Sequence, residues 1–88
     1  MEVLYPDRGG KLLIPIGLDG TRGKAVVELA HRDPDARVHW DLDGAYLLTT
    51  TGTHQHAVEA EDGPHTLTFT DDHGAVLRHS FVVVATRP

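Results

Sequence analysis

The sequence predicts an all-β fold, a sandwich of two antiparallel sheets, and three observations support this fold class. Short segments alternate apolar and polar residues, the period of two that gives a strand one buried and one exposed face. Pairs that suit tight turns separate these segments, namely Asp19-Gly20, Asp43-Gly44, Asp62-Gly63 and His73-Gly74. Glycine in such pairs tolerates the positive φ that hairpin turns require. No segment shows helical periodicity with caps.

About seven strands are expected, and the candidate segments are residues 3–5, 11–16, 24–31, 37–42, 46–50, 55–60, 65–70 and 75–85. The first segment ends at Pro6. The second contains Pro15, which cannot donate to a strand ladder and therefore suits a sheet edge. The third segment reads as a central strand, because Ala25, Val27 and Leu29 share one face.

The later segments supply most of the predicted core. In the fourth, Val38 and Leu42 share a face with Trp40, which we expect to anchor the core. In the seventh, Leu67 and Phe69 point the same way and are expected to face inward. Short strands at this spacing around one tryptophan predict an immunoglobulin-like two-sheet antiparallel sandwich. An up-and-down barrel is the alternative.

Length and composition indicate one small globular domain. A chain of 88 residues buries only about 60–65% of its unfolded surface, so one core is expected. The contents of 40% hydrophobic and 24% charged residues argue against disorder. The absence of cysteine excludes disulfides, thiolate catalysis and cysteine-based zinc sites. Because strands begin near Met1 and run to Ala85, we expect residues 1–88 to be a single domain excised from a larger protein.

Charge and hydropathy exclude two classes of partner. The net charge of −5 is spread along the chain, and no run of Lys or Arg could neutralise a nucleic-acid backbone. We therefore expect no nucleic-acid binding. No stretch approaches the 18–20 or so apolar residues of a membrane span, so direct membrane insertion of this domain is not expected either.

The requirements of catalysis are poorly met. Ser80 is the only serine, and it stands in no nucleophile motif; a phosphate-binding loop is also missing. Two carboxylate pairs, Asp41 with Asp43 and Asp71 with Asp72, lie where hairpin turns are expected, and Asp favours turns by bonding nearby backbone N–H groups. We expect neither enzymatic activity nor a cofactor.

Three side chains form the first candidate binding patch. Tyr46 could stack its ring on a pyranose, and the hydroxyl groups of Thr49 and Thr51 could bond the substituents of that sugar. The same residues could contact a protein partner. The structural alternative is simpler, because threonine is common in strands and Tyr46 would then only cover the hairpin.

Histidines form the second candidate set, because seven of them occur in 88 residues. His54 and His56 are two apart on an expected strand, so both imidazoles would point to one side. His65 or His39 on a neighbouring strand could complete a three-nitrogen metal site. The alternative is a set of solvent-facing strand histidines, and on balance no metal is predicted.

Several stretches resemble a known family. They are residues 38–44, which read Val-His-Trp-Asp-Leu-Asp-Gly, residues 63–74, the Phe81-Val82-Val83 end, the Tyr5-Pro6-Asp7-Arg8-Gly9-Gly10 start and the Ile14-Pro15-Ile16 step. Together they resemble the C-terminal domain of penicillin-binding protein 1C, a bifunctional peptidoglycan synthase. The resemblance covers nearly the whole chain, but residues 49–56 form an unusually long Thr- and His-rich stretch that departs from the family pattern.

The resemblance implies a non-catalytic accessory module of a periplasmic synthase anchored in the inner membrane. Such a module would position the enzyme, or dock it to an envelope protein partner or to peptidoglycan itself. The residues of the family motif are expected to be structural, in core and turn positions: Trp40, Asp43, Gly44, His65, Leu67, Asp71 and Gly74. His65 in particular is expected to cap the rim of the core.

Two other functions remain open from the sequence. A free-standing carbohydrate-binding or adhesive domain would use the patch around Tyr46. A small metal-binding protein would use His54 and His56, and is the weaker of the two alternatives.

Overall fold

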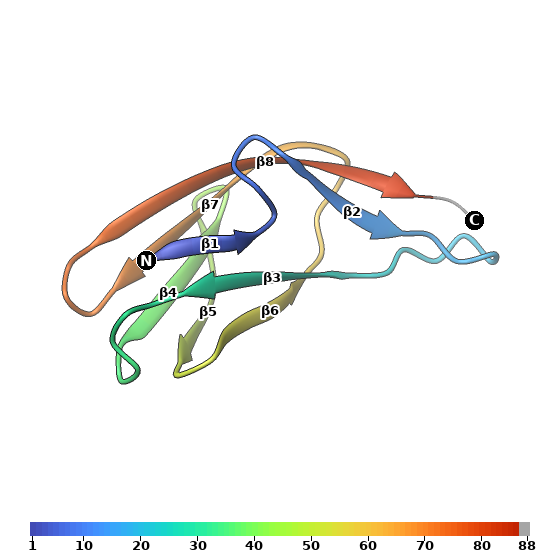
Figure 1. Cartoon of the computed structure of the whole chain (residues 1–88). Helices are drawn as coiled ribbons and strands as arrows, with labels where there is room; N and C mark the ends of the chain where they lie inside the picture. Colours follow the sequence, from blue (N-terminus) through green and yellow to red (C-terminus); the bar gives the residue numbers. More distant parts are fainter. Residues whose placement is uncertain (87–88) are drawn as a thin grey trace.

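The computed structural model describes residues 1–86, and these residues form eight strands and no helix (Figure 1). The strands are β1 (Glu2–Tyr5), β2 (Lys11–Pro15), β3 (Ala25–Ala30), β4 (Arg37–Leu42), β5 (Ala45–Thr51), β6 (His54–Val58), β7 (Gly63–Asp71) and β8 (Val76–Thr86). The all-β prediction is confirmed. All eight candidate segments form strands, with ends that differ from the prediction by one or two residues.

The strands form two sheets, as the sandwich prediction requires. The smaller sheet has the order β1-β3-β6, and the larger has the order β2-β8-β7-β4-β5. Strands β7, β4 and β5 pair through antiparallel ladders, with β4 between the other two. Strand β5 is therefore an outer strand of the larger sheet, and Pro15 likewise lies in an outer strand, β2, as predicted.

One ladder corrects the prediction of a wholly antiparallel sandwich. Strand β2 pairs with β8 in parallel, from Lys11 opposite Val82 to Pro15 opposite Thr86. Figure 1 shows both arrows running toward the C-terminal end of the molecule. The pairing starts where Gly9 donates its N–H to the Ser80 carbonyl at 2.8 Å. The chain leaves β1 in one sheet and enters β2 in the other, so its first two strands cannot form a hairpin.

The core lies between the sheets and is centred on Trp40, as predicted. Trp40, Leu67 and Phe69 are fully buried in the larger sheet. The Trp40 and Phe69 rings meet edge to face, with centroids 4.9 Å apart. Val27 and Leu29 cover them from the smaller sheet, on the face of β3 that the alternation predicted. This core fixes which residues of β4 and β5 point outward.

The hairpin between β4 and β5 has the predicted turn. Asp43 and Gly44 both have positive φ, 51° and 87°, which defines the turn that best matches the twist of two paired strands. Asp43 also binds the neighbouring strand, because its Oδ1 accepts the Thr66 N–H at 2.9 Å. A further turn, at Gly52 with φ 76°, falls in the break expected between residues 46–50 and 55–60, and it divides the Thr- and His-rich stretch into β5 and β6.

Candidate functional site

The candidate binding residues lie on the hairpin of β4 and β5, and alternation along β5 separates them. Thr49 stands opposite His39 and points outward, whereas Thr50 stands opposite buried Val38 and points inward. The ladder is irregular at one step: Trp40 pairs with Leu48 and Asp41 pairs with Tyr46. Leu47 has no partner and forms a β-bulge. This bulge places Tyr46 on the same outer face as Thr49.

The outer face carries a chain of three hydrogen-bonded side chains, His39, Thr49 and Tyr46, which we call the outer chain. His39 Nδ1 lies 2.7 Å from Thr49 Oγ1, and the Tyr46 hydroxyl lies 2.8 Å from the same oxygen. Tyr46 remains 62% exposed. Thr51 is also exposed, opposite Arg37, and takes no part in the chain. The structure thus joins two of the three residues of the predicted Tyr46 patch and adds His39.

The inner face carries a second chain of an aromatic residue, a threonine and a histidine, Trp40, Thr50 and His54, which we call the inner chain. The Trp40 indole N–H donates to Thr50 Oγ1 at 2.8 Å, and this oxygen lies 2.6 Å from His54 Nδ1. Sequence reasoning assigned Trp40 to the core but missed Thr50, whose only signal was its place between two outward threonines. The inner chain ties β4, β5 and β6 together beneath the surface.

His54 corrects the prediction of a solvent-facing histidine. Only 3% of the residue is exposed, because the turn at Gly52 folds the start of β6 over the core. Its Nε2 atom is buried and has no hydrogen-bond partner among the described residues. Burial, followed by the nearby charge of His31, lowers the pKa of His54. His54 is therefore a neutral structural residue at pH 7 and is not available to a ligand in solution.

The proposed metal ligands do not come together. His56 is exposed, and its ring stands edge to face with the Trp40 ring, with centroids 6.3 Å apart. His39 lies on the opposite face of the β4–β5 hairpin. His65 is bound elsewhere, to Asp43. Within residues 1–86, no group of three or more His, Asp or Glu side chains is placed to hold a metal ion. The alternative of a histidine-based metal site therefore gains no support from the geometry.

His65 lies at the rim of the core, where the sequence placed it. Its ring stacks on Phe81 with centroids 6.0 Å apart, Nδ1 lies 2.6 Å from Asp43 Oδ2, and Nε2 lies 2.6 Å from the Glu61 carbonyl oxygen. Burial opposes protonation, but the Asp43 carboxylate and the Glu61 carbonyl outweigh it and raise the pKa of His65. Both nitrogens are therefore committed to structural hydrogen bonds.

A second imidazole–carboxylate pair, His31 with Asp71, was not predicted. Asp71 is buried, and its Oδ2 lies 2.8 Å from His31 Nε2. His31 Nδ1 accepts the Asp33 N–H, so the imidazole proton is on Nε2 and is donated to Asp71. The other carboxylate oxygen accepts the N–H groups of His73 and Ala75, which close the turn between β7 and β8. Asp71 is thus the turn residue that the sequence predicted, with a partner 40 positions away.

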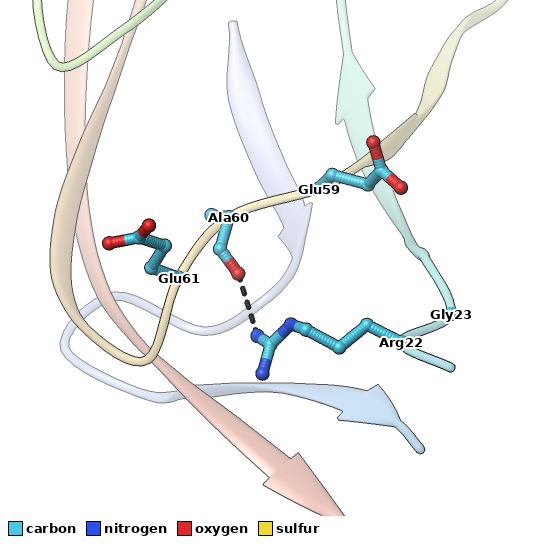
Figure 2. Close-up of a pocket in the computed structure, with 5 residues that line it drawn as sticks. All are labelled: Arg22, Gly23, Glu59, Ala60 and Glu61. Atoms are coloured by element: carbon cyan, nitrogen blue, oxygen red, sulfur yellow. Dashed lines mark hydrogen bonds between the residues drawn. The ribbon is translucent and has the colours of Figure 1, made fainter. Parts of the chain in front are cut away.

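A surface hollow of about 300 Å³ lies between the loop before β3 and the connection after β6 (Figure 2). Its lining includes Arg22, Glu59, Ala60 and Glu61. Arg22 donates to the Ala60 carbonyl at 2.8 Å and pairs with Asp62 at 3.2 Å. Figure 2 shows the two glutamate side chains pointing in opposite directions. Arg22 is the one cationic side chain that lines the hollow, and it is already bonded to the second connection. The hollow is therefore a contact between two connections of the fold.

Fold and side-chain chemistry together define a small β-sandwich module whose imidazole–carboxylate pairs hold turns and strand ends. The family model of the penicillin-binding protein C-terminus family matches residues 1–83, nearly the whole chain. The chain belongs to this family and is an accessory C-terminal domain of a penicillin-binding protein. Searches of curated proteins and of solved structures returned no match.

The family assignment confirms the resemblance seen in the sequence motifs. It agrees with the structural placement of the motif residues, because Trp40 and Leu67 are in the core while Asp43 and Gly44 form a turn. Gly74, with φ 89°, lies in the turn before β8. In the part of the chain that the structure describes, no helix has the length and hydropathy needed to cross a membrane.

Proposed function

We propose that this domain is a non-catalytic docking module of a periplasmic peptidoglycan synthase anchored in the inner membrane. It would hold the synthase near an envelope protein partner or near the glycan strand. Membership in the penicillin-binding protein C-terminus family supports the connection to the synthase and to the periplasm. The role of the module is argued from how its polar side chains are used.

The observation that carries the proposal is the engagement of the imidazole–carboxylate pairs, of which two are largely buried at the imidazole, His65 with Asp43 and His31 with Asp71. A general base needs a free nitrogen or oxygen within reach of a substrate proton. In His65 both nitrogens are taken, by Asp43 and by the Glu61 carbonyl. In the other pair, His31 and Asp71 are almost completely buried, and their remaining atoms bond backbone N–H groups. Neither of these two pairs is free to act on a substrate, and in the third, exposed pair His73 Nε2 is taken by Asp33 Oδ2 at 2.8 Å.

We assign docking to the outer face of the larger sheet. It presents Tyr46 and the exposed Thr51 on β5, next to His39 on β4. Small β modules recruit partners through such flat faces or through their outer strands. A free-standing carbohydrate-binding or adhesive domain would use the same face, but family membership favours a module within a synthase.

The test is deletion of the domain from the complete synthase. We expect the purified deletion variant to keep its glycosyltransferase and transpeptidase rates, because catalysis resides elsewhere in the synthase. In cells, chemical cross-linking should show loss of the neighbours that the intact synthase contacts. A variant with Tyr46→Ala in the complete protein is the matched control for loss of the face without loss of the fold.

Two results would contradict the proposal. A large fall in the catalytic rate of the purified deletion variant would assign the domain a direct part in catalysis. An unchanged cross-linking pattern in cells would show that the domain does not dock the synthase.

A further inference from the structure

We propose that the outer chain is a preorganised platform for one sugar ring, with the exposed face of Tyr46 stacking on a pyranose of a glycan. This inference rests on the proposed docking function and names the surface and the ligand class. Four observations carry it: the position of the tyrosine ring, the restraint of its hydroxyl, the polar neighbours on adjacent strands, and the exposure of the ring.

The position of the ring follows from the hydrogen bond between the Tyr46 hydroxyl and Thr49 Oγ1. Both residues belong to β5 and point to the same side, because the bulge at Leu47 removes one step of alternation between them. A side chain whose far end is bound further along its own strand must run along the sheet surface. The Tyr46 ring therefore lies along the sheet, and its 62% exposure leaves one ring face open to solvent.

The restraint of the ring reduces the cost of binding. Thr49 Oγ1, which binds the Tyr46 hydroxyl, also lies 2.7 Å from His39 Nδ1. His39 of β4 therefore holds the threonine hydroxyl in place, and the threonine hydroxyl restrains the tyrosine. An aromatic ring held in place before binding loses little side-chain entropy when a ligand arrives. An unrestrained surface tyrosine would lack this advantage.

Polar groups on the neighbouring strands surround the platform. Asp41 stands opposite Tyr46, and Thr68 of β7 stands opposite Asp41; Thr70 stands opposite His39. Adjacent strands are about 4.8 Å apart, so Asp41 lies beside the ring, and Thr68 and Thr70 extend the polar surface one strand further across the sheet. They supply a carboxylate acceptor and hydroxyl groups that donate and accept, which matches the ring hydroxyls of a sugar.

The same composition argues against a protein hot spot at this position. Protein interfaces derive most of their affinity from aromatic anchors in dry, well-packed pockets. Tyr46 lies on an open face beside Asp41 and the exposed His39, and an apolar partner would leave these groups without water or hydrogen bonds. A hydroxylated ring satisfies both the flat aromatic face and the polar border.

The test is an NMR titration of the 88-residue chain with the β-1,4-linked tetramer of N-acetylglucosamine. We expect contiguous shifts of Tyr46, Thr49, His39 and Asp41 at millimolar sugar. Tyr46→Ala should weaken binding about tenfold or more, because the stacking surface is lost. Tyr46→Phe keeps the ring but frees it from Thr49, so binding should weaken by a smaller factor.

The chain offers a matched control, because Tyr5 is its only other tyrosine and is 40% exposed in the smaller sheet. Tyr5→Ala should leave sugar binding unchanged. Shifts confined to another surface, or no shifts at all, would overturn the inference. So would equal binding by the Tyr46→Ala variant. Failure of the docking function has a different signature, since it is read from the cross-linking pattern of the complete synthase.

Discussion

The hairpin of β4 and β5 carries two hydrogen-bonded chains of histidine, threonine and an aromatic residue, one on each face. The inner chain joins His54 to Trp40 through Thr50, and the outer chain joins His39 to Tyr46 through Thr49. Trp40 is fully buried, whereas Tyr46 is 62% exposed. The chemistry is nearly the same, so burial distinguishes the chain that stabilises the fold from the chain that we propose as a ligand platform.

The largest expected effect concerns the aromatic residue of the inner chain. Trp40→Ala should lower the free energy of unfolding by about 3–5 kcal/mol, comparable to the whole stability of a domain this small. Urea denaturation followed by circular dichroism measures it. Tyr46→Ala on the outer face is the control and should stay within about 0.5 kcal/mol of the parent chain. If both variants lost the same stability, the distinction between the chains would fail.

The two threonines give the sharpest matched pair. Thr50→Val preserves shape but leaves the Trp40 indole N–H and His54 Nδ1 without their partner, which should cost about 1–3 kcal/mol. Thr49 faces water, so Thr49→Val should lower the free energy of unfolding by no more than about 0.5 kcal/mol. Denaturation of both variants under the same conditions checks this. A Thr49→Val variant less stable than Thr50→Val would reverse our assignment of the two faces.

The histidines should respond to pH in opposite directions. Burial lowers the pKa of His54 below its ordinary value of about 6.5, so the unfolded chain binds its proton first as the pH falls. The contribution of neutral His54 to stability is present above pH 6.5 and is lost as pH falls through its folded pKa. For His65 the raised pKa gives a contribution that is present below pH 6.5 and is lost as pH rises through its folded pKa.

Two variants separate these contributions. The free energy of unfolding of His54→Gln should fall less than that of the parent chain between neutral pH and about pH 5, because the variant has no imidazole to protonate at this position. His65→Gln should remove the His65 part of the opposite trend, the stability gained as pH falls through the raised folded pKa of His65. Denaturation curves at several pH values provide the measurement. Parallel curves for parent and His54→Gln would mean that His54 is not buried as described.

The smallest expected effect on stability belongs to the hydroxyl of the outer chain. Tyr46→Phe removes one exposed hydrogen bond and should change the free energy of unfolding by less than about 0.5 kcal/mol. NMR relaxation should instead show faster motion of the ring in the variant, because Thr49 no longer holds it. Equal ring mobility in both proteins would remove the restraint on which the sugar platform depends.

Local patterns were enough to predict the strands and the main turn. Alternation around Trp40 identified the inward face of β4, and the Asp43-Gly44 pair specified its hairpin, because both depend on neighbours in the sequence. Alternation also predicted the rim position of His65, which shares the inward parity of Leu67 and Phe69, and its ring stacks on Phe81.

Features that depend on distant segments could not be predicted. The parallel pairing of β2 with β8 joins residues about 70 positions apart, and no local pattern distinguishes it from antiparallel pairing. His54 becomes buried only because β6 crosses to the other sheet after the turn at Gly52. The bulge at Leu47 depends on how β5 registers against β4, and it decides that Tyr46 can reach Thr49.

The most direct test of the two-face account is the NMR titration with the N-acetylglucosamine tetramer, observing both chains in one spectrum. The account predicts shifts of Tyr46 and Thr49, with the Trp40 indole and His54 signals unmoved. Shifts of the Trp40 indole and His54 without shifts of Tyr46 would contradict it, because the buried chain would then be the one that responds to a ligand.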